Sequence, residues 1–264
     1  MVLPPVALNG PIITIRQFPT HPIEMEQLIA WGAVTKDAVE FLRKLVIAGY
    51  NIFISGGTGS GKTTFLNALS NYIPKQERII TIEDNAELQI RGVENLVRLE
   101  ARKGNTQGDH EITIRDLIRA SLRMRPDRVI VGEVRGEETI DMIQAMNNGH
   151  DGSLSTGHGN SPRDMLARLE TMVLMGMELP VSAVRRQIAS GLDIMVHLGR
   201  MRDRSRKVLE ILEITGYSYE KEEILTHTLY EFEETGKGQE KVIGTLIKKG
   251  ELQQTRKLER AGLV

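Results

Sequence analysis

Gly56-Gly57-Thr58-Gly59-Ser60-Gly61-Lys62-Thr63 fits the pattern G-x-x-x-x-G-K-[ST], which is typical of loops that bind nucleotide phosphates. The residues before this loop, 51–54, are a short apolar run of the kind found in buried strands. The residues after it, 64–73, repeat apolar side chains at the spacing of a helix. The motif requires a strand, a glycine loop and a helix in this order, so the sequence predicts a phosphate-binding loop here.

The predicted loop assigns roles to its backbone and side chains. Its glycines allow backbone N–H groups to turn toward phosphate oxygens, and the helix that follows adds a partial positive charge. Lys62 is predicted to reach the β- and γ-phosphates, and the hydroxyl of Thr63 is predicted to bind Mg²⁺. The other loop residues predicted to bind nucleotide are Gly57, Thr58, Gly59, Ser60, Gly61 and Thr64. ATP and Mg²⁺ are therefore the predicted ligands.

Composition limits the classes of protein that fit. The chain has 264 residues, enough for one large domain or one domain plus a fragment, and its formal net charge is −1. This near-neutral balance gives no global reason to expect nucleic acid as a partner. The sequence contains no cysteine, which excludes disulfides, thiolate zinc sites and cysteine nucleophiles and fits a cytosolic protein. We expect neither a signal peptide nor a membrane span, because no apolar run approaches about 20 residues.

The pattern along the chain predicts three regions. Residues 1–18 read as extended chain, a turn and one strand over 12–18. Because a lone strand is not stable, we expect 1–18 to be the end of an N-terminal domain whose remainder is not in this sequence. Residues 19–34 are predicted to be a linker and a short helix, and 35–264 the main domain, with a more polar subregion from about 200.

Strand and helix patterns alternate through most of the main domain. The predicted helices are 24–31, 35–49, 64–73, 113–125, 137–146, 162–173, 181–188 and 251–261. The predicted strands are 51–54, 78–82, 95–99, 129–131, 153–156, 193–198 and 208–215. This alternation indicates an α/β fold with a mostly parallel sheet.

Acidic residues follow two of the predicted strands. Glu133 comes after strand 129–131, and Glu83 with Asp84 ends strand 78–82. The carboxyl ends of parallel strands face the crevice where ligands bind, so both acids are candidates to act on the nucleotide. Glu133 is predicted to contact Mg²⁺ or the attacking water, and either Glu83 or Glu133 could be the general base. The alternative is that these acids are solvated surface residues.

His158 and Asn160 lie in a loop before the helix that begins at Pro162. A histidine in such a loop is often structural, and a role in sensing the γ-phosphate is the alternative. Arginines are the other candidates for contact with phosphate, because phosphoryl transfer spreads negative charge over the γ-oxygens. Their spacing in the sequence does not discriminate among the candidates, which are Arg16, Arg98, Arg102, Arg115, Arg119, Arg123 and Arg125.

Four motifs occur in one order along the chain: the phosphate loop ending in Lys62 and Thr63, residues 79–84, residues 125–135, and the stretch around His158 followed by 168–170. In this order they resemble the secretion and pilus traffic ATPases of the type II/type IV secretion superfamily. Residues 1–5, 113–126 and 147–162 look most like its tight-adherence (Flp) pilus branch, the CpaF-type ATPases. The resemblance covers nearly the whole chain, including 255–258.

The resemblance implies a RecA-like P-loop NTPase domain, preceded by a remnant of an N-terminal domain. It implies a cytoplasmic, Mg-dependent ATPase that forms a homo-hexamer in the full-length protein. It also implies peripheral association with the cytoplasmic face of the inner membrane, through a pilus or secretion platform protein. Lys62, Thr63, Glu83, Glu133 and His158 match active-site positions of the family, and Arg16 matches the strand that offers an arginine to the γ-phosphate. The chain departs from the family at residues 157 and 159, where it has glycine and relatives often carry larger residues.

Four hypotheses compete. A motor for pilus assembly or secretion is the leading one, and an ATPase of type IV secretion, for conjugation or effector export, is its alternative within the superfamily. A RecA-like nucleic-acid binder would need a basic groove with stacking aromatics, and only 4% of the residues are aromatic. A catalytically silent scaffold is disfavoured because Lys62, Glu83 and Glu133 are all present.

Overall fold

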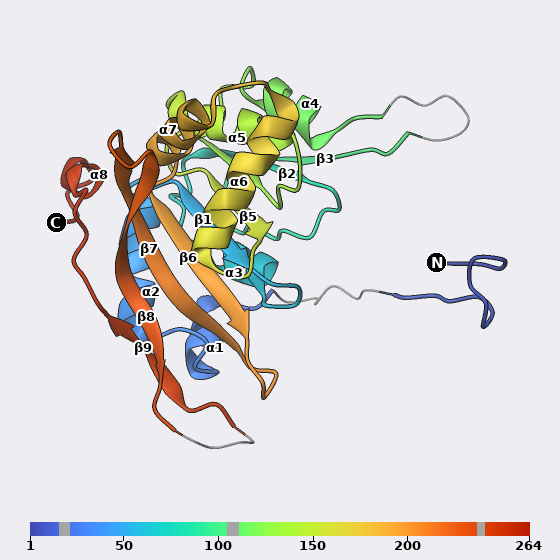
Figure 1. Cartoon of the computed structure of the whole chain (residues 1–264), viewed down its shortest axis with the longest axis horizontal. Helices are drawn as coiled ribbons and strands as arrows, with labels where there is room; N and C mark the ends of the chain where they lie inside the picture. Colours follow the sequence, from blue (N-terminus) through green and yellow to red (C-terminus); the bar gives the residue numbers. More distant parts are fainter. Residues whose placement is uncertain (16–21, 105–110, 237–240) are drawn as a thin grey trace.

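The computed structural model describes residues 1–15, 22–104, 111–236 and 241–264. Within them, nine strands form one sheet in the order β3-β2-β4-β5-β1-β6-β7-β8-β9 (Figure 1). The strands are β1 (Ile52–Gly56), β2 (Arg78–Glu83), β3 (Asn95–Glu100), β4 (Arg128–Val131), β5 (Leu154–His158), β6 (Ile194–Arg200), β7 (Arg206–Ser218), β8 (Glu223–Glu234) and β9 (Gly244–Lys248). Neighbours from β3 to β6 are parallel, and those from β6 to β9 are antiparallel.

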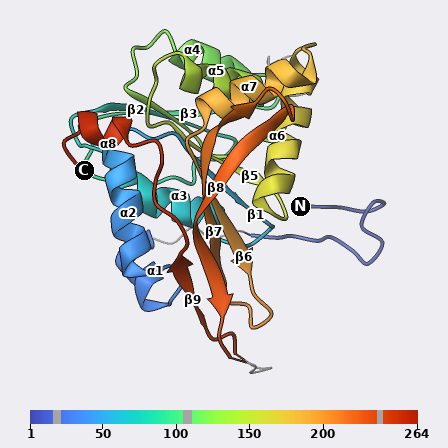
Figure 2. The same cartoon turned by 60° about the vertical axis from the view of Figure 1, so that its left-hand side comes forward.

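Helices cover both faces of this sheet. They are α1 (Met25–Ala30), α2 (Lys36–Ile47), α3 (Lys62–Ser70), α4 (Ile114–Ser121), α5 (Glu138–Asn147), α6 (Pro162–Gly176), α7 (Val181–Gly191) and α8 (Arg256–Arg260). Alternation along β1 sends Ile52 and Ile54 to one hydrophobic cluster, with α1, α2 and α3, and Phe53 to the other, with α4 to α7. Figure 2 shows α2 beside the antiparallel part of the sheet, with α8 next to it. β1 is consequently buried along its whole length.

The predicted α/β class with a mostly parallel sheet is confirmed, and so are most of the predicted elements. The predicted strand 12–18 is wrong in its described part, where Ile12 forms only an isolated bridge with Val2. The helix predicted to run from 113 toward Pro126 ends at Ser121, and Arg125 takes a left-handed φ of 56°. In a continuing helix the ring of Pro126 would clash with the carbonyl of Leu122, and Pro126 has no N–H to donate to that carbonyl, which accounts for the early end.

The C-terminal region differs most from the prediction. The helix predicted over 251–261 is limited to α8, and the hairpin of β8 and β9 was not predicted at all. β8 carries many glutamate and threonine side chains and has an exposed face, so its apolar content is too low for a strand to be recognised.

Residues 1–15 extend away from the body of the molecule (Figure 1). The proposed domain boundary at residue 18 falls within 16–21, outside the described residues, as does Arg16. The division of the chain into three regions therefore stays a prediction. No helix in the described ranges combines the length and apolar character that crossing a membrane requires.

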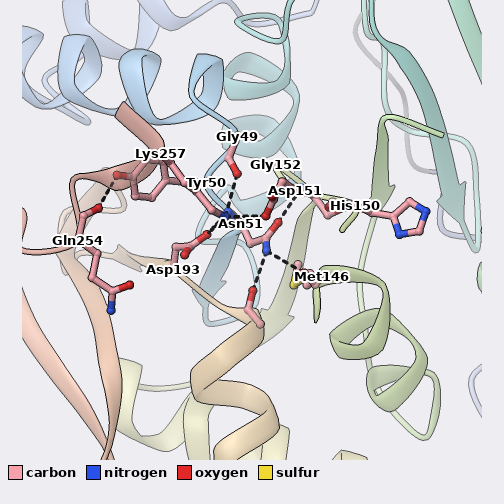
Figure 3. Close-up of polar contacts among 12 residues, drawn as sticks. Gly49, Tyr50, Asn51, Met146, His150, Asp151, Gly152, Asp193, Gln254 and Lys257 are labelled. Carbon is pink, nitrogen blue, oxygen red and sulfur yellow. Dashed lines mark hydrogen bonds and ion pairs between the residues drawn. The ribbon is translucent and has the colours of Figure 1, made fainter. Parts of the chain in front are cut away.

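A polar cluster joins α8 to the amino-terminal ends of β1 and β6 (Figure 3). The Lys257 ammonium donates to Asp193 (2.7 Å), Asp151 (2.8 Å) and the carbonyl of Gly49 (3.1 Å). Asp193 also accepts the backbone N–H of Asn51 (2.7 Å), which immediately precedes β1. These contacts attach the C-terminal segment to the end of β1 opposite the phosphate loop.

Replacing Lys257 by methionine is expected to lower the free energy of unfolding by about 2 kcal/mol at pH 7, because Asp193 loses its cation in a site of low exposure. Burial raises the pKa of Asp193 above its usual 3.8, although Lys257 opposes this. The contribution of Asp193 to the free energy of unfolding is therefore fully present below the pKa that Asp193 has in the unfolded chain. It is lost as the pH rises through the higher pKa that Asp193 has in the folded protein. Loss of Lys257 raises that pKa further, so the destabilisation should be larger at pH 7 than at pH 4.

Urea unfolding at both pH values measures this effect. The exposed pair of Lys248 and Glu251 supplies the control, since Lys248→Met should cost less than about 0.5 kcal/mol. Equal losses for the two variants would contradict a structural role for the Lys257 cluster.

Candidate functional site

The phosphate loop connects β1 to α3, as the sequence predicts. A Cβ on Gly56 would lie 2.4 Å from the carbonyl oxygen of Leu198 and 2.6 Å from Ser60 Oγ, so this position requires glycine. Gly61 has a left-handed φ of 95° and immediately precedes the first residue of α3. The loop therefore curls at the start of a helix, where backbone N–H groups have no partner within the helix and favour an anion.

Lys62, the first residue of α3, is buried. Its Nζ donates to the carbonyl oxygens of Gly56 (3.1 Å) and Gly57 (3.3 Å), which places the ammonium against the curled loop. Burial lowers the pKa of Lys62, and the nearby carboxylate of Glu133 acts in the opposite direction. A partly desolvated cation in this position binds a phosphate anion more strongly than a solvated one does.

Glu83 ends β2 and is only 4% exposed. Its Oε1 accepts the backbone N–H groups of Glu87 (3.0 Å) and Leu88 (2.9 Å). Burial nevertheless raises the pKa of Glu83 above the usual 4.5. Gly132 packs against this side chain so closely that a Cβ there would lie 3.0 Å from Glu83 Cγ. Glu83 is therefore held beside the end of the neighbouring strand, β4.

Glu133 follows β4 by two residues and is held by two partners. Arg135 donates from Nε to Glu133 Oε2 (2.7 Å) and from Nη1 to Asp84 (3.2 Å). His158, the last residue of β5, brings its Nδ1 against Glu133 Oε1. Because β2, β4, β5 and β1 are neighbours in the sheet, their carboxyl ends bring the acids, the histidine and the phosphate loop to one edge.

A cavity of about 760 Å³ opens at this edge. Of the residues predicted to form the site, those that line it are Thr58, Gly59, Ser60, Gly61, Lys62, Thr63, Thr64, Glu83, Glu133 and His158. Gly57 belongs to the loop without lining the cavity, and Glu87 lines it although it was not among the predicted site residues. The roles of these residues in binding and catalysis remain predictions.

Sequence reasoning missed two walls of the cavity. One comes from the α1 region and is mainly apolar, with Ile23, Leu28, Trp31 and Ala33. The other comes from the turn between β6 and β7, where Arg206 donates from Nε to the carbonyl of Gly59 (2.9 Å). The sequence does contain a run of basic residues at 200–207, which was a possible sign of this wall. Nothing in the local sequence, however, relates that run to the phosphate loop more than 140 positions earlier.

The family of the chain is decided by a match over nearly its whole length. The model of the family described as "Type II/IV secretion system protein" matches residues 2–250. The chain belongs to this family. The resemblance of the four motifs is thereby confirmed at the level of the superfamily, and the tight-adherence branch stays a prediction.

Two curated relatives and one solved structure illustrate the similarity. The "Putative conjugal transfer protein Rv3659c" of Mycobacterium tuberculosis is 40% identical over 210 residues, 80% of this chain and 59% of that protein. The "Type IV secretion system protein PtlH" of Bordetella pertussis is 40% identical over 177 residues, 65% of this chain and 52% of that protein. The crystal structure of the VirB11 ATPase from the Brucella suis type IV secretion system, in complex with sulphate, is 33% identical, has a TM-score of 0.61, and is matched over 75% of this chain and 60% of its own. The chain spans less than two thirds of the length of each of them.

In this type II/IV secretion family protein, the candidate arginines between the two acids do not line the cavity. Arg115 pairs with Glu137 (2.5 Å) and Asp141 (2.8 Å), and Arg119 pairs with the same aspartate (2.7 Å). These two arginines therefore join α4 to α5. Arg16 lies outside the described residues, so its predicted contact with the γ-phosphate stays a prediction.

Gly157 and Gly159, where the resemblance leads us to expect larger residues in relatives, pack tightly here. A Cβ on Gly157 would lie 2.8 Å from the Phe53 ring and 3.0 Å from Met165 Cε. A Cβ on Gly159 would lie 3.0 Å from Met165 Cβ. The bulk of Phe53 and Met165 thus fills the space that larger residues at these positions would need, and the strand that carries His158 stays close to β1 and α6.

Proposed function

We propose that this chain is the nucleotide-hydrolysing motor domain of a secretion or pilus machine, converting ATP and water to ADP and phosphate. One observation carries the proposal: a single cavity joins the lysine of a phosphate loop to two glutamates from adjacent parallel strands. Lys62 and the loop would bind the phosphates, and the acids would position the attacking water. A binding module without chemistry would not need both acids.

The residues present fit a magnesium nucleotide. The cavity volume lies in the range of small-molecule sites, and the phosphate loop lines it from Thr58 to Thr63. Thr63 offers a hydroxyl and Glu133 a carboxylate, which are the oxygen ligands that Mg²⁺ prefers. When bound, Mg²⁺ would neutralise charge on the phosphate oxygens. The apolar wall from α1, with Leu28 and Trp31, suits the nucleobase.

The surroundings of the two glutamates favour different roles for them. Glu83 has no cation within ion-pairing distance in the part of the chain that the structure describes, and burial raises its pKa, as a general base requires. Glu133 is ion-paired with Arg135 through Oε2 and lies against His158 through Oε1, so both oxygens of its carboxylate already have partners. We therefore assign water activation to Glu83, metal contact to Glu133 and phosphate contact to His158.

The relatives favour one branch of the family over the other. Their printed names refer to conjugal transfer and to type IV secretion, so export through a type IV secretion machine is the better supported assignment. Assembly of a tight-adherence pilus rests on the sequence stretches 1–5, 113–126 and 147–162 alone. Genes for pilins or for conjugation proteins beside the gene of this chain would separate the two.

The partners and location follow from the same proposal. A homo-hexamer of the full-length protein would act at the cytoplasmic face of the inner membrane, against a membrane platform protein. Direct binding of nucleic acid is not part of the proposal. Single-stranded nucleic acid binds on stacking aromatic side chains, and the described residues that line the cavity include only two of phenylalanine, tyrosine or tryptophan, Trp31 and Phe65.

We expect the purified chain to bind ADP and ATP in the presence of Mg²⁺ and to release phosphate from ATP. Trp31 is the single tryptophan and lines the cavity, so its fluorescence should change on nucleotide binding. Calorimetry, fluorescence and phosphate release measure the three effects. Single-stranded DNA serves as the control ligand and should not raise the rate. Absence of nucleotide binding, or strong stimulation by DNA, would overturn the proposal.

A further inference from the structure

The hairpin of β6 and β7 carries basic side chains at its tip, with Arg200 and Arg206 directly opposite each other in antiparallel register. Like charges in opposed positions destabilise a pair of strands. Such a pair is therefore expected to have an acidic partner that offsets the repulsion.

Carboxylates satisfy the neighbouring arginine but not this pair. Arg202, between them in sequence, forms a double ion pair with Glu234 of β8, in which Nη1 donates to Oε2 at 2.8 Å. Within residues 1–15, 22–104, 111–236 and 241–264, Arg200 and Arg206 form no ion pair with a carboxylate. The positive charges of Arg200 and Arg206 are therefore not neutralised by a carboxylate of the described residues and are available to an anionic ligand.

Arg206 is aimed at the nucleotide site. Its Nε–H donates to the carbonyl of Gly59 in the phosphate loop (2.9 Å), and its Cδ lies 3.4 Å from the position of a Cβ on Gly61. Arg206 also lines the cavity. Since Gly59 binds only the Nε–H, the N–H groups of both Nη atoms can serve a ligand. Arg200 approaches the same loop, with Nη1 4.0 Å from the position of a Cβ on Gly59.

The backbone of the hairpin holds this arrangement in place. The N–H of Met201 donates to the carbonyl of Ser205 (2.8 Å) and closes the turn. Asp203 accepts the N–H (2.9 Å) and hydroxyl (2.6 Å) of Ser205 and the N–H of Val242 (2.9 Å), and these hydrogen bonds lower the pKa of Asp203 to about 2. The turn is thus fixed both internally and to the segment before β9, so Arg206 is positioned before any ligand binds.

We propose that Arg206, with Arg200 behind it, is a second phosphate-binding element of this site, which contacts the phosphates of a nucleoside di- or triphosphate held by the loop of the same chain. The guanidinium fork matches two phosphate oxygens, and it approaches from the hairpin wall while Lys62 approaches from within the loop. The inference rests on the proposed function, because it needs a nucleotide in this cavity.

Calorimetric titration of the purified protein with Mg–ADP and Mg–ATP tests this inference. Arg206→Gln should weaken both affinities about tenfold, since a charge-assisted contact with phosphate is lost. Arg200→Gln should weaken them about threefold, because its charge acts from farther away. Adenosine lacks phosphate, so its affinity should not depend on Arg206. When wild type and Arg206→Gln are compared at the same fractional occupancy by a fluorescent ADP analogue, adenosine should displace the analogue from both with the same half-maximal concentration.

Arg204→Gln is the matched control. Arg204 lies in the same turn and carries the same charge, but it does not line the cavity. Its affinities should stay within about twofold of wild type. If Arg204→Gln loses as much nucleotide affinity as Arg206→Gln, the loss reflects only the change in net charge and the inference is overturned. Wild-type affinity in Arg206→Gln would overturn it as well.

The wild-type titration separates this inference from the proposed function. If wild type binds ADP and Lys62→Ala does not, while Arg206→Gln binds normally, the nucleotide site stands and the arginine element is wrong. If wild type binds neither nucleotide, both are overturned. Thermal unfolding of each variant confirms that the protein compared is folded.

Discussion

Lys62→Ala lowers the rate of ATP hydrolysis by about 10²-fold or more, because the phosphates lose the side-chain cation that the loop supplies. Nucleotide affinity falls with it. The effect is large because Lys62 is buried against the loop carbonyls and no other lysine of the loop can replace it. Phosphate release and calorimetry measure the two losses.

Lys75→Ala provides the comparison for this variant. Lys75 lies shortly after α3 and donates to the carbonyls of Asn71 (3.2 Å) and Arg91 (2.7 Å), away from the nucleotide cavity. Its removal takes away the same charge with little expected effect on hydrolysis. Hydrolysis by Lys62→Ala within tenfold of wild type would contradict the assignment of the phosphate loop.

Glu83→Gln should leave nucleotide affinity nearly unchanged and slow hydrolysis by about 10²- to 10⁴-fold, the usual contribution of a general base. The amide keeps the shape of the side chain, and its oxygen can still accept the N–H groups of Glu87 and Leu88. Glu133→Gln is the matched variant, with a smaller expected loss of turnover, because Arg135 and His158 already restrain that carboxylate. Single-turnover hydrolysis at saturating ATP compares the two.

The pH dependence gives an independent readout of the same assignment. Because burial raises the pKa of Glu83, wild-type hydrolysis should fall on the acid side through a pKa above 4.5. Glu133→Gln should retain this limb of the profile. If Glu133→Gln is the slower variant, the roles of the two acids are reversed. If both variants turn over normally, neither acid activates water.

The sequence predicts the phosphate loop and the acids because each stands at the end of a strand that its apolar residues reveal. β1, β2 and β4 are fully or almost fully buried, so their composition alone marks them as strands. Parallel strands bring their carboxyl ends to one edge, and this rule gathers Lys62, Glu83 and Glu133 without knowledge of the strand order.

The hairpin and α1 walls could not be predicted in the same way. Arg206 reaches Gly59 only because β6 pairs with β1, a contact between segments far apart in the chain. Spacing along the chain carries no trace of such a neighbour. The β8–β9 hairpin was not predicted for a different reason. A strand with an exposed face can carry polar side chains and still pair with its neighbour through its backbone.

The burial of β1 has a consequence for motion. All five residues of this strand are buried, and it pairs with β5 on one side and β6 on the other. Backbone in such a position is expected to open only when the whole domain unfolds, so the phosphate loop begins from a rigid part of the sheet. Under the proposed function, any displacement that accompanies nucleotide turnover is therefore expected in the α1 wall of the cavity, and not at the point where the phosphate loop leaves β1.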